Sequence, residues 1–186
     1  MGLKKRMVNS AFIFAICTIK MKTGRLIVTY KCPKNCVGCC NKNWKYDPPK
    51  VITHYDYDEI VITGGEPLLF PDKVIALVKE IRMKSTAKIL LYTAKTEGFM
   101  NILPYVDGIT FTLHAPEDVS GFNFFCYKNY QHLIDSKKSL RLNIFKEAIV
   151  HSTPLYSYLF KTKEIVWKKD CPLPKNEELL CLAELW

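Results

Sequence analysis

Apolar residues are grouped along this chain in short blocks, and six of the blocks have the length of β-strands. They are rich in β-branched and aromatic residues. Several are apolar throughout, which is typical of strands covered on both faces. The six predicted strands are RLIVTY at 25–30, EIVIT at 59–63, KILLYT at 88–93, GITFTL at 108–113, LRLNIF at 140–145 and EIVW at 164–167.

Two of the intervening segments carry a helical pattern. In PDKVIALVKEIRM, at 71–83, the apolar residues recur on one helical face, and Pro71 stands where a first helical turn tolerates proline. FNFFCYKNYQHLID, at 122–135, is the second predicted helix. Strands that alternate with helices indicate βαβ units and a mostly parallel sheet. We therefore expect an α/β fold with a six-stranded sheet, either open or curled into part of a barrel.

The length and composition agree with a single domain. The chain has 186 residues, of which 48% are apolar and 24% are charged, as in globular proteins. We assign the domain, with a short C-terminal tail, to 21–186. Residues 1–20 are an extension in which KKR and AFIFAICTI imitate a secretory signal. The apolar run is too short to span a membrane, so we expect a packing strand or helix, or a true translation start at Met21.

The charge and the distribution of cysteines restrict the partners and the cellular compartment that we expect. The formal net charge is +9, and the densest group of lysines surrounds a cysteine-rich loop: Lys31, Lys34, Lys42 and Lys45. A nucleic-acid partner is compatible with this charge but less favoured than a solvated surface. Four of the eight cysteines lie in one loop, which fits metal binding in a reducing cytoplasm better than a secreted disulfide framework.

Two motifs follow the first two predicted strands directly. Cys32, Cys36 and Cys39 have the spacing C-x3-C-x2-C after the first strand, and GGEP at 64–67 ends the second. The carboxyl ends of parallel strands meet at one edge of a sheet, where ligands bind, so we expect one shared site. Three thiolates are one short of filling a four-iron cluster, and they also suffice for an open zinc site.

Together, these motifs resemble those of the radical S-adenosylmethionine superfamily, over about 21–170. The resemblance implies a partial (β/α)6 barrel and a 4Fe–4S cluster held by Cys32, Cys36 and Cys39. It also implies that S-adenosylmethionine chelates the fourth iron and is split reductively to a radical that takes a hydrogen atom from a substrate. A flavodoxin- or ferredoxin-like protein would donate the electron.

The resemblance also suggests cofactor-binding residues. Glu66 and the carbonyls of Gly64 and Gly65 would accept hydrogen bonds from the amino group of S-adenosylmethionine. Pro67 would fix the turn, and Gly38 would lie near the adenine. Three residues near the ends of later strands are further candidates for the ribose or the substrate: Tyr92, His114 and Asn143.

The substrate stays open at this point. CCNKNW at 39–44 is similar to the small activases of anaerobic ribonucleotide reductase, which implies a glycine of a partner protein as substrate. The second half of the chain does not resemble an activase. A small-molecule enzyme like the 7-carboxy-7-deazaguanine synthases, with Mg²⁺ for an acidic substrate, is the alternative. A zinc-stabilised nucleic-acid-binding module is the non-enzymatic alternative, although it gives GGEP no task.

The remaining cysteines and histidines are expected to be less informative. C-x3-C could also be read from Cys36 to Cys40, but the resemblance to the superfamily selects Cys39, which implies that Cys40 is a neighbour of the ligands and not one of them. We expect Cys126, Cys171 and Cys181 to be buried, inert thiols. The histidines expected at the surface are His54, His132 and His151.

Overall fold

A computed structural model describes residues 21–36, 38–44, 49–168 and 171–186. The predicted extension at 1–20 and Lys45 lie outside the described residues. Within the described ranges, no helix combines the length and the apolar character needed to cross a membrane.

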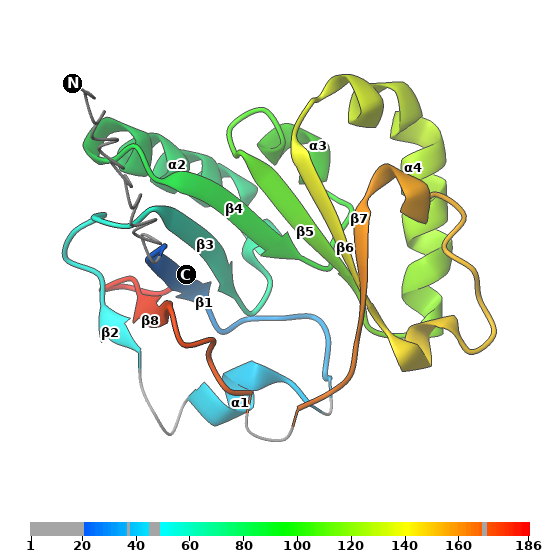
Figure 1. The fold of residues 1–186 in the computed structure, drawn as a ribbon, viewed down its shortest axis with the longest axis horizontal. Helices are drawn as coiled ribbons and strands as arrows, with labels where there is room; N and C mark the ends of the chain where they lie inside the picture. The colour runs from blue at the N-terminus through cyan, green and yellow to red at the C-terminus, as the bar shows by residue number, and fades with distance from the viewer. Residues whose placement is uncertain (1–20, 37, 45–48, 169–170) are drawn as a thin grey trace, which may run out of the picture.

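The described residues form one sheet of eight strands in the order β2-β8-β1-β3-β4-β5-β6-β7, and each pairing among these strands is parallel. The sheet runs linearly from β2 to β7 and is not closed (Figure 1). Its strands are β1 Thr23–Thr29, β2 Lys50–Val51, β3 Glu59–Gly64, β4 Lys88–Thr93, β5 Gly108–Leu113, β6 Ser139–Phe145, β7 Lys161–Ile165 and β8 Glu177–Cys181. The prediction of an α/β fold with a mostly parallel sheet is confirmed, but the strand number of six is wrong.

The two missed strands lie at one edge of the sheet. β8 comes from the C-terminal segment, which was predicted to be a tail, and it inserts between β1 and the two-residue strand β2. After β8 the chain continues along β1, where the Trp186 amide donates to the Val28 carbonyl at 3.0 Å. The mixed polarity of EELLC hid this strand, because only Leu180 of its five residues is fully buried.

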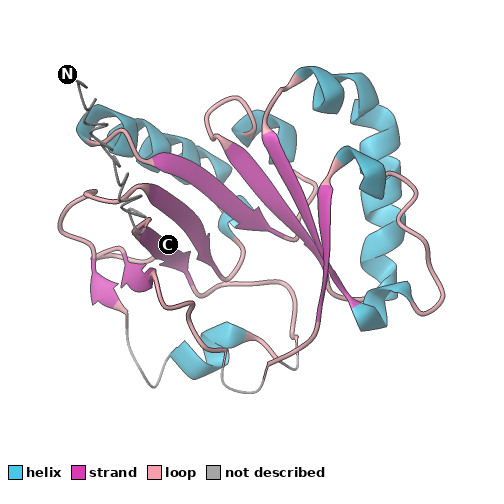
Figure 2. Cartoon of the chain, in the orientation of Figure 1, coloured by secondary structure: helices cyan, strands magenta, loops and turns pink. Residues whose placement is uncertain are grey.

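The helices differ from the prediction mainly in their bounds. α2 is Pro71–Lys84, as predicted to within one residue, while α4 is Pro116–Asp135 and begins six residues before the predicted start at 122. The six residues that the prediction missed, PEDVSG at 116–121, are mostly polar and include Gly121, which concealed the start of the helix. The short helices are α1 Cys40–Trp44 and α3 Phe99–Ile102, with 3-10 turns η1 Pro67–Leu69, η2 Lys146–Ile149 and η3 Ser157–Leu159 (Figure 2).

The two faces of the sheet have different compositions. One face carries alternate apolar residues of β1 and β3–β6, such as Leu26, Ile62 and Phe111, which pack in the main core with α2, α3 and α4. Figure 1 shows these three helices on one side of the sheet, with α1 and the cysteine loop away from them. The other face carries Arg25, Tyr92 and further polar residues. We call the second face the inner face.

Replacement of Leu180 by Ala tests the insertion of β8. Leu180 is 3% exposed and belongs to the main core, where its side chain lies next to Gly24 of β1, so the loss of free energy of unfolding should be about 2 to 4 kcal/mol. Leu173→Ala, at a side chain that is 36% exposed, should cost about 0.5 kcal/mol or less. Urea unfolding measures both values, and equal losses would contradict the insertion.

Candidate functional site

The two sequence motifs are joined by backbone hydrogen bonds. The amide of Gly65 donates to the Thr29 carbonyl at 2.6 Å, and the amide of Glu66 donates to the Lys31 carbonyl at 2.8 Å. β1 and β3 shift register here, because Thr29 faces Gly64 while Ile27 faces Thr63. The extra residue on β1 redirects the chain at the point where the cysteine loop begins. The predicted proximity of the two motifs is therefore confirmed.

The two glycines are required by this junction. Gly64 has φ 129°, a conformation that side chains disfavour, and an added Cβ would collide with the Thr29 carbonyl oxygen. A Cβ on Gly65 would collide with the Lys31 carbonyl oxygen. The glycines thus have a structural role that the sequence did not reveal. Within the described residues the Gly65 carbonyl accepts no hydrogen bond, so it is available to a ligand.

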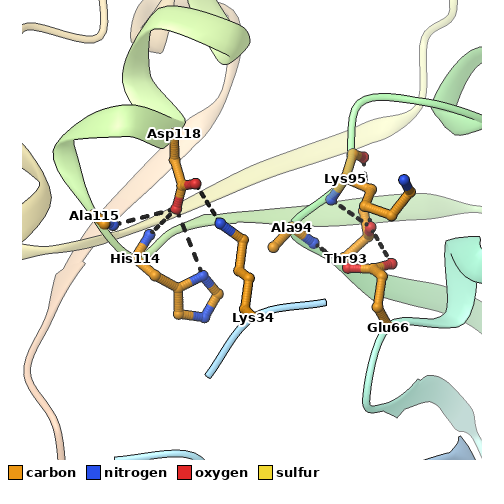
Figure 3. Close-up of polar contacts among 8 residues, drawn as sticks. All are labelled: Lys34, Glu66, Thr93, Ala94, Lys95, His114, Ala115 and Asp118. Atoms are coloured by element: carbon orange, nitrogen blue, oxygen red, sulfur yellow. Dashed lines mark hydrogen bonds and ion pairs between the residues drawn. The ribbon is translucent and has the colours of Figure 1, made fainter. Parts of the chain in front are cut away.

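The carboxylate of Glu66 fastens β3 to β4. It is 2% exposed and accepts from the Leu68 amide at 2.9 Å. It also accepts from the Thr93 hydroxyl at 2.6 Å and the Ala94 amide at 2.8 Å (Figure 3). Burial raises its pKa, while these three hydrogen bonds and the nearby Lys95 oppose the rise. A carboxylate has about four acceptor positions, so one remains for a ligand.

A cavity of about 260 Å³ opens at this edge of the sheet. Among its lining residues are eight of the predicted site residues: Cys32, Cys36, Cys39, Gly64, Gly65, Glu66, Tyr92 and His114. Three predicted residues do not line it. Gly38 packs beneath Trp167, Pro67 is buried at the start of η1, and Asn143 points to the inner face of β6.

The three predicted ligand thiols are neighbours in this cavity. All three are unpaired, and burial raises the pKa of Cys32 and Cys36, with a further rise from the charges of neighbouring thiols. Among the residues that the structure describes, no three Cys, His, Asp or Glu side chains converge closely enough to hold a metal ion. The ligand set therefore stays a prediction. A bound cation would reverse the pKa rise, since a coordinated thiol is deprotonated.

Cys40 and Cys171 form a disulfide, with Cα atoms 5.4 Å apart and a sequence separation of 131 positions. The prediction that Cys171 is an inert free thiol is therefore wrong, while Cys40 is engaged by a partner other than the candidate ligands. The bond ties the start of α1 to the C-terminal segment. Because a reducing compartment disfavours such bonds, a cytoplasmic location stays a prediction.

The other predicted cysteines and histidines lie largely where expected. Cys126 is free and fully buried, and burial raises its pKa to about 12. Cys181 is free but only half-buried. The three histidines expected at the surface are exposed: His54, His132 and His151.

An ion pair spans the cavity from the cysteine loop to α4. Lys34 pairs with Asp118, whose side chain is 10% exposed (Figure 3). Asp118 also accepts from the amides of His114 at 2.7 Å and Ala115 at 3.2 Å, so it caps the first turn of α4. Of the other lysines near the loop, Lys42 donates to the Cys36 carbonyl at 3.0 Å. Local sequence patterns contain no signal for the Lys34–Asp118 pair, because its members are 84 positions apart.

Aromatic rings form one wall of the cavity. His114 lies 5.2 Å from Phe145 and 5.8 Å from Trp167, measured between ring centroids, and Phe145 stacks on Trp167 at 3.8 Å. Burial lowers the pKa of His114 to about 4, so its ring is neutral at pH 7. Its Nδ1 is 3.9 Å from Asp118, too far for a hydrogen bond, and has no partner among the described residues. A neutral imidazole can accept a proton or a hydrogen bond from a ligand.

Further lining residues were missed by sequence reasoning. Arg25 contacts Glu177 through an ion pair at 2.6 Å and lies 5.1 Å from the ring of Tyr92. Asn41 is 7% exposed, and its Oδ1 has no partner within the described chain. Arg25 is the one charged residue in an otherwise apolar predicted strand, which was the available signal.

Substitution of Gly65 by Ala should destabilise the junction. The new Cβ must displace the Lys31 backbone, so we expect a loss of about 2 kcal/mol in the free energy of unfolding. Gly121→Ala is the matched control, because a Cβ at this helical position meets nothing within 4 Å. This substitution should raise the free energy of unfolding by about 0.5 to 1 kcal/mol. Chemical denaturation measures both. If Gly65→Ala leaves the free energy of unfolding unchanged, the close approach of the Gly65 and Lys31 backbones is absent.

The buried neutral His114 predicts a pH dependence of stability. Its pKa is about 4 in the folded chain and about 6.5 when unfolded. Between these values the unfolded state binds the proton first, so stability falls as the pH drops from about 6.5 to 4, by at most about 3 kcal/mol. His114→Gln lacks the titrating ring and should not lose this stability. As the pH drops over the same interval, its free energy of unfolding should therefore rise by this amount relative to that of the unsubstituted protein. His151→Gln controls for the removal of an exposed imidazole, and a constant difference for His114→Gln would contradict the prediction.

The comparisons with known proteins add no family. No protein-family model matches this chain, and a search of the curated proteins finds no match. The functional interpretation therefore depends on the chain's own residues. These are three unpaired thiols, a buried carboxylate and an unpartnered imidazole around one cavity at the carboxyl edge of a parallel sheet.

Proposed function

We propose that the chain is a radical S-adenosylmethionine enzyme that abstracts a hydrogen atom from its substrate. The observation that carries the proposal is the hydrogen-bonded junction between the C-x3-C-x2-C loop and GGEP. It directs the thiols of Cys32, Cys36 and Cys39 and the carboxylate of Glu66 to the same cavity. Neither motif would be specific alone.

The donor set fits a 4Fe–4S cluster with one open iron. Three thiolates are available, and the disulfide removes Cys40 from competition for the same metal. Lys34 and Lys42 lie at the loop and would offset the negative charge of a cluster. When bound and reduced, the cluster would supply the electron that splits S-adenosylmethionine to a 5′-deoxyadenosyl radical and methionine.

The protein's own groups would bind and orient the nucleotide. Glu66 retains one acceptor position for the ammonium group, and the Gly65 carbonyl would be a second acceptor. Tyr92 and His114 line the same cavity and would contact the ribose or the substrate. Gly38 would influence the adenine only indirectly, since it packs beneath Trp167.

The sheet supports the proposal at the level of topology. Apart from β2 and β8, the strands lie side by side in the sheet in the order in which they occur along the chain. The helices α2, α3 and α4 pack on one face of this sheet. This arrangement is what a partial (β/α)6 barrel requires, with β8 and β2 as an addition at the edge. An open sheet leaves the inner face accessible to a substrate.

Two substrates are compatible with the resemblance. One is a backbone glycine of a partner protein, and the other is a purine-like metabolite handled with Mg²⁺. We expect the enzyme to work in the cytoplasm, with a flavodoxin- or ferredoxin-like protein as electron donor.

Anaerobic purification with iron and sulfide reconstitution tests the proposal. A brown protein with about four irons per chain is expected, and it should form 5′-deoxyadenosine after reduction in the presence of S-adenosylmethionine. A colourless protein with one bound zinc would refute it and favour the zinc-stabilised module. Transfer of deuterium from a labelled glycine or from a labelled pterin would separate the two substrates.

The ligand register can be tested with neighbouring cysteines. Cys39→Ala should lose most of the bound iron, because a three-thiolate site loses a ligand, whereas Cys40→Ala should retain it. Iron per chain is measured after identical reconstitution. Cys171→Ala is the matched control, since it removes the same disulfide without altering the loop. Equal iron loss in Cys39→Ala and Cys40→Ala, with Cys171→Ala intact, would mean that the register is wrong.

A further inference from the structure

Two rows of polar side chains lie on the inner face next to the cavity. Residues that pair in register on neighbouring strands point to the same face, so the strand pairing defines these rows. The first row is Thr110, Arg141 and Lys161, and the second is Thr112, Asn143 and Lys163. Thr112 also lines the cavity, so the rows continue directly from it. We call these six residues the inner-face array.

The array has three positive charges and no negative one. No ion pair joins Arg141, Lys161 or Lys163 to any residue in the described part of the chain. The described strands β5, β6 and β7 place no Asp or Glu on the inner face, because Glu164 pairs with Ile144 on the opposite face. Arg25 lies on the same face but, unlike these three residues, forms an ion pair, with Glu177.

The spacing of the charges suits one small anion. Neighbouring strands are about 4.8 Å apart, and alternate residues on a strand are about 6.6 Å apart. Arg141 and Lys161 are lateral neighbours, and Lys163 is one row further along. Their long side chains can therefore converge on a single carboxylate or phosphate group, and Arg141 can bind it through two parallel hydrogen bonds.

Unpartnered polar groups beside the charges point to a ligand as well. Thr110 is 2% exposed, and its hydroxyl has no partner among the described residues. The side chain of Asn143 forms no hydrogen bond with the described chain either. Asn143 is only half-buried, so its amide can be hydrated, whereas a buried hydroxyl such as that of Thr110 is normally paired. The Thr110 hydroxyl is therefore the group that points to a ligand.

We propose that the inner-face array binds the anionic group of a small acidic molecule, a carboxylate or a phosphate. The stacked rings of Phe145 and Trp167 offer a flat apolar wall for the rest of that molecule. The cavity of about 260 Å³ lies next to the array, and Thr112 belongs to both. Only the identification of this molecule as the substrate rests on the proposed function; the binding itself does not.

Nuclear magnetic resonance titration of the full-length, ¹⁵N-labelled protein tests the inference. Sodium citrate and sodium phosphate are added separately at constant ionic strength, so that carboxylate and phosphate recognition are distinguished. At least one of them should cause saturable shifts of the Thr112, Asn143 and Lys163 amides. The double variant Arg141→Gln/Lys163→Gln should weaken this binding at least tenfold.

Lys79→Gln/Lys128→Gln is the matched control, because it removes two charges from exposed helical positions and should leave the affinity unchanged. If the Arg141 variant does not fold, Lys161→Gln/Lys163→Gln on the exposed strand β7 replaces it, with the same tenfold expectation.

Three results would overturn the inference. The first is that neither anion causes a saturable shift. The second is that the folded double variant binds the anion with the same affinity as the unsubstituted protein. The third is that an eight-nucleotide single strand binds more tightly than both anions and is displaced by neither. Iron content and 5′-deoxyadenosine formation are measured on the same preparation. Anion binding without iron would refute the proposed function alone, and iron with product but no anion binding would refute this inference alone.

Discussion

The site depends on a backbone junction that tolerates no Cβ. The amides of Gly65 and Glu66 bond to the carbonyls of Thr29 and Lys31, so the end of β3 is held against the beginning of the cysteine loop. Only glycine at positions 64 and 65 allows the two backbones to approach this closely. Glu66, held by the same junction, then bridges to β4 through Thr93 and Ala94. One short contact therefore positions the loop, the carboxylate and the ends of three strands.

Two more connections hold the cysteine loop across the sheet. The Lys34–Asp118 pair links it to the start of α4, and the Cys40–Cys171 disulfide links α1 to the C-terminal segment. Each connection joins residues that are far apart in sequence, so each also orders a second region. Asp118 stabilises the first turn of α4 by accepting backbone hydrogen bonds, and that turn presents His114 to the cavity. A loop with three anchors can present three thiols without regular secondary structure of its own.

The sheet separates stability from chemistry by its two faces. The apolar face buries its side chains against α2, α3 and α4 and supplies most of the core. The inner face also buries a few apolar residues, such as Ile27 and Val61, but it carries Arg25, Tyr92, Arg141 and the other polar residues. Polar side chains in the middle of strands would destabilise a sheet covered on both faces by an apolar core. Their presence on β4–β7 therefore indicates that this face meets water or a ligand.

The sequence by itself determined most of the elements and the meeting of the two motifs. Long apolar runs predict parallel strands because such strands must be buried, and the ends of neighbouring parallel strands share one edge. α2 was predicted for the same reason, since its apolar face repeats with the helical period. The tertiary structure alone decided the place of β8, the partner of Cys171, the Lys34–Asp118 pair and the composition of the inner face. These depend on contacts between residues many positions apart, and local patterns of polarity contain no information about which distant residues will meet.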